Sequence, residues 1–305
     1  MTADQILTLV VAILGGALRV GAPFLFVSLG ECITEKAGRI NLGLEGVLVL
    51  SAMAAFGGSY LSGSAWIGVL CAMAAGGLLA ALHGVLCTLP RVNDVATGIA
   101  LMLLGAGLAF YLGKPLIQPQ AAQLPPIELG AWSSSPAIKA ALQINPLVTV
   151  GVLLAGGLWW AFAHTRAGLL VRMAGDSAQA ARALGYSVGG IRIAATAAGG
   201  MVAGLGGACL TLFYPGSWNE GISSGQGLIA VALVIFARWD PLRCVVAALL
   251  FGGAGAVGPA LQSVGISWGY HLFNIVPYVL TLAILVASCR PGQLAAGSPG
   301  ELSSR

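Results

Sequence analysis

Charge is scarce in this chain. Asp, Glu, Lys and Arg together make up only 8% of the 305 residues, about a third of the proportion in an ordinary soluble domain. Aromatic residues are also few, at 7%, and there are only three histidines. A surface that faces water on every side could not be built from this composition. A soluble globular protein is therefore excluded.

Several motifs of catalytic and metal sites are missing as well. The chain has neither a GxxxxGK[ST] phosphate-binding loop nor an HExxH zinc motif. Its six cysteines show no CxxC spacing, so we expect no metal site and no disulfide framework. The net charge is +4, but the basic residues do not form a patch interleaved with aromatics. We therefore predict no binding of nucleic acid.

Long apolar runs are what the chain does have. Hydrophobic residues make up 58% of it and glycine accounts for 45 positions, and several uncharged runs reach the 18 or so residues that a bilayer core requires. This pattern predicts an all-α integral membrane protein with about eight to ten transmembrane helices, including broken helices and a weak inverted repeat. The predicted spans lie near residues 6–29, 41–61, 64–89, 95–113, 145–163, 191–213, 223–238, 244–262 and 270–289.

Two long polar segments separate these spans and predict the orientation. Residues 164–190 carry three arginines against the single acid Asp176, which places them in the cytoplasm by the positive-inside rule. Residues 114–144 are rich in Pro, Ser and Gln and should form a loop on the opposite, extracytoplasmic face. A nine-span model with an external N-terminus then puts eleven of the fourteen basic residues inside.

Residues 30–46, GECITEKAGRINLGLEG, interrupt the first two apolar runs with charge. On helical spacing Glu31 and Glu35 share one face, and Asn41 and Glu45 share another. One interpretation is a polar lining of a solute route at membrane depth. The other is a solvated cytoplasmic loop in which Asn41 caps the next helix. The residues alone favour neither interpretation.

Two further segments are candidates for function. Within the cytoplasmic segment, residues 174–187 predict a short helix capped by Asp176 or Ser177 and ended by Gly185, which favours a docking surface over a plain connector. In residues 214–241, Tyr214 and Trp218 suit an interfacial belt. The Gly-Ser run before Gly227 would allow a half-helix that offers its N–H groups to a solute, although a simple extracellular turn is somewhat favoured.

Together these segments resemble the permease subunits of ATP-binding-cassette importers, in the branch of ribose-type and branched-chain amino acid permeases. The likeness is strongest to the nucleoside-type permeases, whose early pattern GE-x-ITE-x-[AS]G-x-INLGLEG is matched by residues 30–46. Their cytoplasmic loop pattern is matched by Thr165, Gly168, Arg172, Gly175, Ala180, Ala181 and Gly185. Residues 225–262 are similar to their C-terminal half.

The resemblance implies a subunit that is not an enzyme and binds no cofactor, with ATP bound and hydrolysed on a separate cytoplasmic ATPase. It also implies a second, different permease subunit, an external solute-binding protein or lipoprotein, and a bacterial-type plasma membrane. The residues expected to couple to the ATPase are Arg172, Gly175, Asp176, Ala180, Ala181 and Gly185. The pathway candidates are Glu31, Glu35, Asn41, Glu45, Gly225 and Gln226.

Nucleosides are the solute that the resemblance favours. The alternatives are a sugar, a flavin-type vitamin or a branched-chain amino acid. Outside this family, a stand-alone secondary transporter is the main rival interpretation, and a membrane-embedded enzyme is a third. Convergent His, Cys or acidic groups at one membrane surface, which an enzyme would need, are not evident in the sequence.

Overall fold

A computed structural model describes residues 3–117, 120–135, 138–139, 142–213, 216–263, 275–288 and 298–303, and helices dominate it. The helices are α1 (Ala3–Lys36), α2 (Leu44–Ser62), α3 (Ala65–Leu86), α4 (Asp94–Gly113), α6 (Pro146–His164), α7 (Arg166–Asp176), α8 (Ala178–Ala183), α9 (Val188–Leu212), α10 (Gln226–Phe236), α11 (Pro241–Ser263), α13 (Val276–Ser288) and α14 (Gly300–Ser303). A 3₁₀ turn, η1 (Lys114–Leu116), follows α4, and β1 (Ile127–Glu128) pairs antiparallel with β2 (Gln143–Ile144).

The prediction of an all-α membrane protein is confirmed. Within the described residues, seven helices are long and apolar enough to cross a bilayer, namely α1, α2, α3, α4, α6, α9 and α11. Most of their ends lie within about three residues of the predicted spans. The span predicted at 270–289 falls partly outside the described residues, which contain α13 from Val276.

Helix α10 is shorter than the span predicted at 223–238. It has 11 residues, which at about 1.5 Å per residue is roughly 16 Å, half of a hydrocarbon core. Residues 216–225 before it form turns and bends rather than helix. The chain therefore contains a half-length helix preceded by irregular backbone, as the Gly-Ser run allowed.

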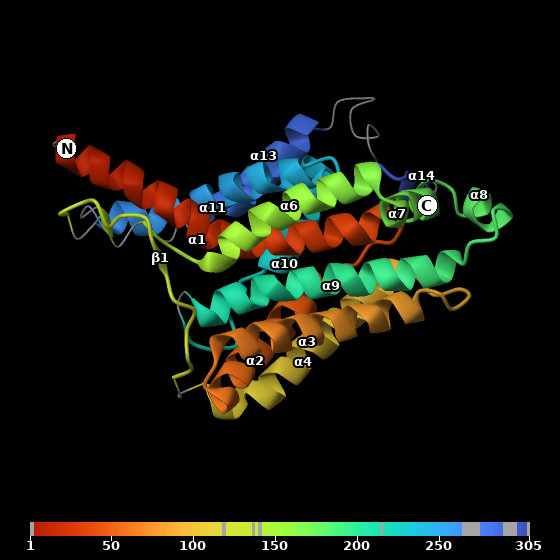
Figure 1. The fold of residues 1–305 in the computed structure, drawn as a ribbon, viewed down its shortest axis with the longest axis horizontal. Coiled ribbons are helices and arrows are strands. Elements are labelled where there is room, and N and C mark those ends of the chain that lie inside the picture. Colours follow the sequence, from red (N-terminus) through yellow and green to blue (C-terminus); the bar gives the residue numbers. More distant parts are fainter. Residues whose placement is uncertain are drawn as a thin grey trace.

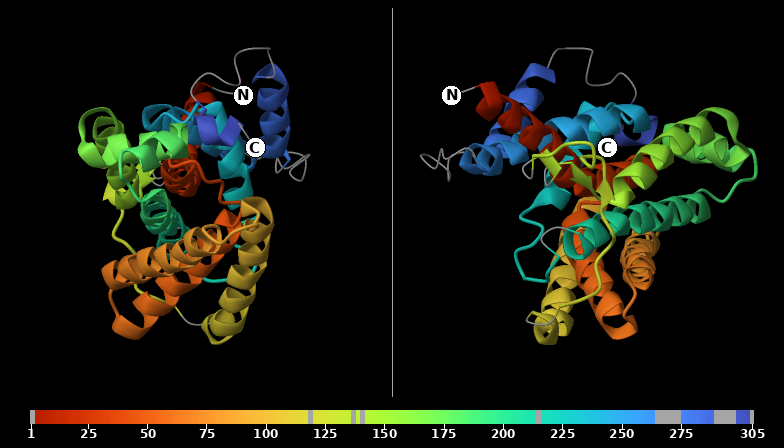
Figure 2. Two further views of the ribbon diagram at one scale, coloured as in Figure 1. Left: turned by 90° about the vertical axis from the view of Figure 1, so that its right-hand side faces the viewer. Right: turned by 60° about the vertical axis from the view of Figure 1, so that its left-hand side comes forward.

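The helices form two groups joined by α9 (Figure 1). Helices α2, α3 and α4 lie together on one side, and α1, α6 and α11 lie on the other, as both views in Figure 2 show. Helix α9 contacts α1, α2 and α3 and so packs against both groups. Helix α10 lies near the middle of the long axis.

Glycine permits the close crossing of α1 and α9. A Cβ atom on Gly30 would overlap the carbonyl oxygen of Gly199, and a Cβ atom on Gly199 would overlap that of Gly30. The two backbones therefore touch at this point, which is the close approach between membrane helices that small residues allow.

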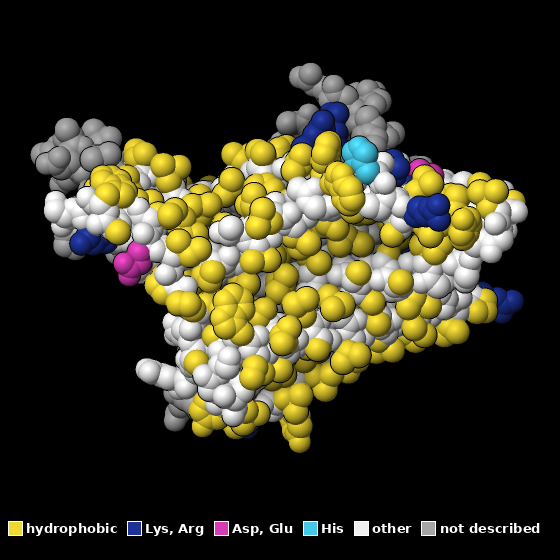
Figure 3. Space-filling view, in the orientation of Figure 1, with side chains coloured by type: hydrophobic (Ala, Val, Ile, Leu, Met, Phe, Trp, Pro, Cys, Tyr) yellow, Lys and Arg dark blue, Asp and Glu magenta, His cyan; other side chains and the backbone are white. Residues whose placement is uncertain are grey.

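Loops and charges gather toward the two ends of the long axis. The β1–β2 hairpin lies at one end and α7, α8 and α14 lie at the other (Figure 1). On the face drawn in Figure 3, a broad band of hydrophobic and uncharged side chains separates the charged groups of the two ends. The two polar segments thus lie on opposite ends, as opposite membrane faces require.

Candidate functional site

The charged segment 30–46 is buried rather than solvated. Helix α1 continues through Glu31 and Glu35 to Lys36, and both carboxylates lie on one face of it, with exposed fractions of 0% and 2%. The predicted shared face of these two residues is confirmed. The solvated-loop interpretation is wrong, because almost the whole segment packs against other helices.

Three buried polar side chains in this segment have specific partners. A carboxylate oxygen of Glu31 accepts the backbone N–H of Asn41 at 2.8 Å. The Glu35 carboxylate accepts the indole N–H of Trp239, which follows α10. The Asn41 amide oxygen accepts the N–H of Gly43 at 3.0 Å. These bonds offset the desolvation of polar groups at depth.

Asn41 and Glu45 do not share a helical face, contrary to the spacing argument. Residues 37–43 are not helical, and Gly38 has φ +82°, which ends the first helix. The N-cap of α2 is Gly43, without a side-chain cap, so Asn41 stabilises the preceding turn and does not cap the helix. Asn41 contacts Glu31 within the α1–α2 connection, whereas the Glu45 side chain contacts the start of α10.

Glu45 holds the start of α10. One carboxylate oxygen accepts the Ser223 hydroxyl at 2.5 Å and the Gly225 N–H at 3.1 Å, and the other accepts the Gly227 N–H at 2.7 Å. The N-terminus of a helix carries a partial positive charge and unpaired N–H groups, which a carboxylate satisfies. Gln226, also predicted, is half-buried between the two glycines.

The turn segment 216–225 is held against α2 and α4 by one buried aromatic side chain, Trp218. Trp218 is 1% exposed and packs among buried residues of α2 and α4, including Met53 and Phe56. Its predicted place in an interfacial belt is therefore wrong; Tyr214 lies outside the described residues. Burial of one side of the segment leaves Asn219, Glu220 and Ser224 on its exposed side.

Helix α13 closes onto this exposed side. The Tyr278 hydroxyl donates to the Ser224 carbonyl at 2.8 Å, and Tyr278 remains 46% exposed. A polar, exposed surface thus lies beside the start of α10, made by residues 219–226 and Tyr278. We call it the α10 entry surface.

A buried ion pair fixes the α1–α2 connection to α4. One Arg39 guanidinium nitrogen lies 2.6 Å from an Asp94 carboxylate oxygen, and the other terminal nitrogen donates to the Cys87 carbonyl at 2.5 Å.

The thiol of Cys87, beside this ion pair, is also buried. Burial raises the pKa of the Cys87 thiol to about 11.

Residues 164–190, which the sequence predicts to lie in the cytoplasm, contain two helices where one was predicted. Helix α7 begins after Thr165, whose hydroxyl accepts the Gly168 N–H, and α8 begins after Ser177, whose hydroxyl accepts the Ala180 N–H at 3.2 Å. The predicted cap at Ser177 and the end at Gly185, with φ +83°, are confirmed.

The six predicted coupling residues divide between the surface and the interior. Asp176, Ala180 and Gly185 are exposed, Arg172 is partly buried, and Gly175 and Ala181 are buried. A Cβ atom on Gly175 would overlap the Lys36 carbonyl oxygen, so this glycine allows α7 to pack against α1. Leu184 and Tyr186, which the prediction omitted, are 67% and 45% exposed beside α8.

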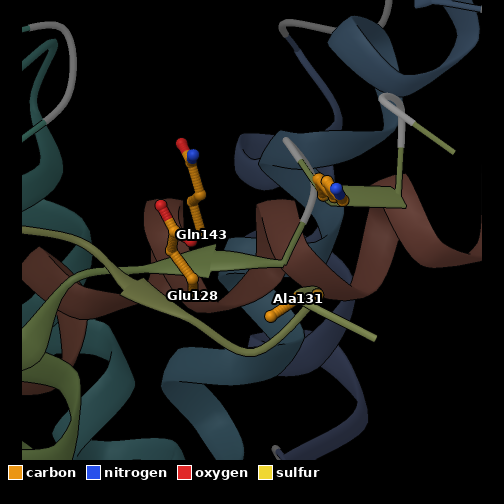
Figure 4. Close-up of a pocket in the computed structure, with 5 residues that line it drawn as sticks. Glu128, Ala131 and Gln143 are labelled. Carbon is orange, nitrogen blue, oxygen red and sulfur yellow. The ribbon is translucent and has the colours of Figure 1, made fainter. Parts of the chain in front are cut away.

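The opposite end carries a small open cavity on the hairpin (Figure 4). It measures about 160 Å³ and is lined by Glu128, Gly130, Ala131, Lys139 and Gln143. Glu128 and Gln143 face each other in the strand register, and their side chains extend to the same side of the hairpin. The cavity is shallow and polar, suited to surface contact rather than to enclosing a solute.

Comparison with known proteins extends this picture. The family model described as branched-chain amino acid transport system, permease component, matches residues 13–287. A putative glucose ABC transporter permease of Haloferax volcanii is 33% identical over 296 residues, covering 90% of each chain. A nucleoside ABC transporter permease of Lactococcus lactis is 27% identical over 293 residues, again with 90% of each chain covered.

Two further comparisons bear on assembly and fold. A second glucose ABC transporter permease of Haloferax volcanii is 25% identical over 255 residues, covering 75% of this chain and 64% of that protein. The solved inward-facing structure of a putative metal-chelate type ABC transporter covers 90% of this chain and 85% of its own, with a TM-score of 0.53 and 15% identity. That likeness shows the fold alone.

Proposed function

Because the chain belongs to the family of permease components of branched-chain amino acid transport systems, we propose that it is one permease subunit of an ATP-binding-cassette importer. It forms half of the pathway through which a small solute crosses the membrane, and it works by alternating access. The relatives reported above are themselves named as permeases of ABC transporters, which supports this assignment.

The α10 entry surface carries the proposal. A face that touches lipid tails cannot leave polar backbone and side chains exposed, since each unpaired group costs several kcal/mol there. The entry surface leads into a half-length helix near the middle of the long axis, and Ser224, two residues before that helix, is exposed. It therefore faces either another protein subunit or a water-filled route, and broken helices at mid-membrane are typical of solute sites.

Nucleosides are the solute class that we propose. A nucleoside is uncharged and rich in hydrogen-bonding groups, which suits hydroxyl, amide and backbone groups such as Ser224, Gln226 and Tyr278. The Lactococcus relative is named as a nucleoside permease, which supports this choice. The glucose name of the Haloferax relatives makes a sugar the second candidate; a flavin-type vitamin and a branched-chain amino acid are the remaining alternatives.

The partners follow from the same assignment. One organism has two related permeases with the glucose name, one much closer to this chain than the other, which supports a second and different permease subunit here. The exposed residues of α8, with Leu184 and Tyr186, would dock on a cytoplasmic ATPase that binds and hydrolyses ATP. A binding protein or lipoprotein would deliver solute at the hairpin end, and the complex would lie in a bacterial-type plasma membrane. The chain itself would bind no cofactor.

Reconstitution in liposomes tests the proposal. Radiolabelled adenosine or uridine should enter only when this chain is combined with its partner permease, the ATPase, the binding protein and ATP. Unlabelled nucleoside should compete, and glucose, riboflavin and leucine should not. Uptake by the isolated chain under an ion gradient would instead establish a secondary transporter. Competition by glucose alone would replace the nucleoside assignment with a sugar.

A further inference from the structure

Helix α14 packs against the proposed coupling region. Its first residue, Gly300, lies so close to the end of α7 that a Cβ atom there would be 2.5 Å from the Asp176 carbonyl oxygen. Leu302 packs against the apolar cluster formed by α1, α10 and α11. This short helix therefore touches both the coupling region and the membrane helices.

Glu301 forms two hydrogen bonds at this junction. One carboxylate oxygen accepts the backbone N–H of Ala178, the first residue of α8, at 2.9 Å. The other accepts an Arg192 guanidinium N–H at 3.2 Å. Ser177 accepts the N–H of Ala180, and Glu301 adds a second cap to α8 with a charge that the helix N-terminus favours.

Arg192 links this carboxylate to the membrane helices. It lies near the start of α9 and is 5% exposed, and it donates to the Ala37 carbonyl at 3.0 Å and to the Ala174 carbonyl at 2.9 Å. Gly38 leaves room for it, because a Cβ atom there would lie 3.0 Å from a guanidinium nitrogen. The ends of α1 and α7, the start of α9 and Glu301 thus meet at one side chain.

We propose that Glu301 is a positioning residue that holds α8 in register with α1 and α9 through Arg192, so that movement of α8 is transmitted to the membrane helices. The inference rests on the proposed function, since it concerns how an attached ATPase drives transport. Without Glu301, α8 would remain attached to the chain but would move more freely relative to Arg192. ATP hydrolysis would then continue with less solute moved for each ATP.

Glu301→Ala and Glu301→Gln test the proposal in the fully assembled transporter. Glutamine keeps an oxygen that can accept the Ala178 N–H but loses the charge facing Arg192. Glu301→Gln should therefore keep part of the coupling that Glu301→Ala loses. Arg91→Ala, which removes an exposed charge from the loop between α3 and α4, is the control. The two measurements are solute taken up per ATP hydrolysed, and amide hydrogen exchange across residues 174–187.

The expected results are specific. Glu301→Ala should lower uptake per ATP at least threefold and speed exchange across residues 174–187 at least tenfold, with exchange in α2 unchanged. Glu301→Gln should fall between parent and alanine, and Arg91→Ala should match the parent. Unchanged exchange, unchanged uptake per ATP, or a glutamine variant no better than alanine would each overturn the proposal. Absence of ATP-driven uptake in the parent would instead count against the proposed function.

Discussion

Arg39 and Asp94 form an ion pair of 2.6 Å across 55 positions of sequence, with both side chains buried. Removal of one partner leaves a charge in a low-dielectric interior, which typically costs about 3–5 kcal/mol. We therefore expect Arg39→Ala to lower the thermal unfolding midpoint of the purified permease in detergent markedly. Arg91→Ala, in the exposed loop nearby, is the control and should leave the midpoint nearly unchanged. Equal midpoints for the two variants would contradict the role of the pair.

Glu45 provides the second prediction. Glu45→Ala leaves the N–H groups of Gly225 and Gly227 and the Ser223 hydroxyl without their acceptor, at about 1–3 kcal/mol for each buried group. We expect ATP-driven uptake to fall at least tenfold, and Glu45→Gln, which keeps one acceptor oxygen, to lie in between. Glu220→Gln removes an exposed charge in the same region but removes no helix cap, so its melting midpoint should match that of the parent, whereas the midpoint of Glu45→Ala should fall. Equal midpoints for the two variants would refute the capping argument.

The exposed side of α8 provides the third prediction. Ala180→Trp places a large side chain on the proposed ATPase-docking surface without touching the core, since Ala180 is exposed. Binding of the ATPase should weaken at least tenfold in a pull-down of purified subunits, while the melting midpoint of the permease stays constant. Gly175→Trp should instead lower that midpoint, because Gly175 contacts the Lys36 carbonyl. Normal ATPase binding by the Ala180 variant would remove this docking surface.

Trp218 provides the fourth prediction. It is buried against α2 and α4, and truncation of a buried tryptophan to alanine costs about 3–5 kcal/mol. Trp218→Ala should therefore lower the melting midpoint strongly, whereas Trp66→Ala should not, because Trp66 is 53% exposed. The same midpoint in both variants would show that segment 216–225 is not anchored by this side chain.

The reactivity of Cys87 gives a prediction about pH. Its pKa is raised to about 11 by burial, so the thiolate fraction rises about tenfold per pH unit up to that value. In a variant whose only cysteine is Cys87, maleimide labelling should keep accelerating from pH 7 to pH 10. A cysteine at the exposed position Leu184 should level off near pH 9, one unit or less above an ordinary thiol pKa. A plateau for Cys87 at the same pH would contradict the raised pKa.

Much of the fold could be predicted because it depends on local composition. Apolar runs of about 20 residues indicated the long helices, and the Ser177 and Gly185 signals of α8 act within a few residues of themselves. The predicted shared face of Asn41 and Glu45 failed because Gly38 and Gly43 interrupt the helix on which the spacing argument depended.

The contacts of the candidate site could not be predicted from sequence. Trp239 reaches Glu35 across 204 positions, and Glu301 reaches Arg192 across 109. Nothing in a run of residues indicates which distant chain segment will supply a partner. Trp218 likewise suited a membrane interface by residue type, but α2 and α4 form a space that it fills.

The carboxylate of Glu45 at the start of α10 also has a consequence for selectivity. A helix N-terminus that is open to the pathway would attract phosphate groups, but here an acidic side chain of the same chain already occupies the donors. A phosphorylated solute gains nothing from this helix end and meets a negative charge instead. Under the proposed function, a nucleotide would be repelled at this helix end, whereas an uncharged nucleoside would not.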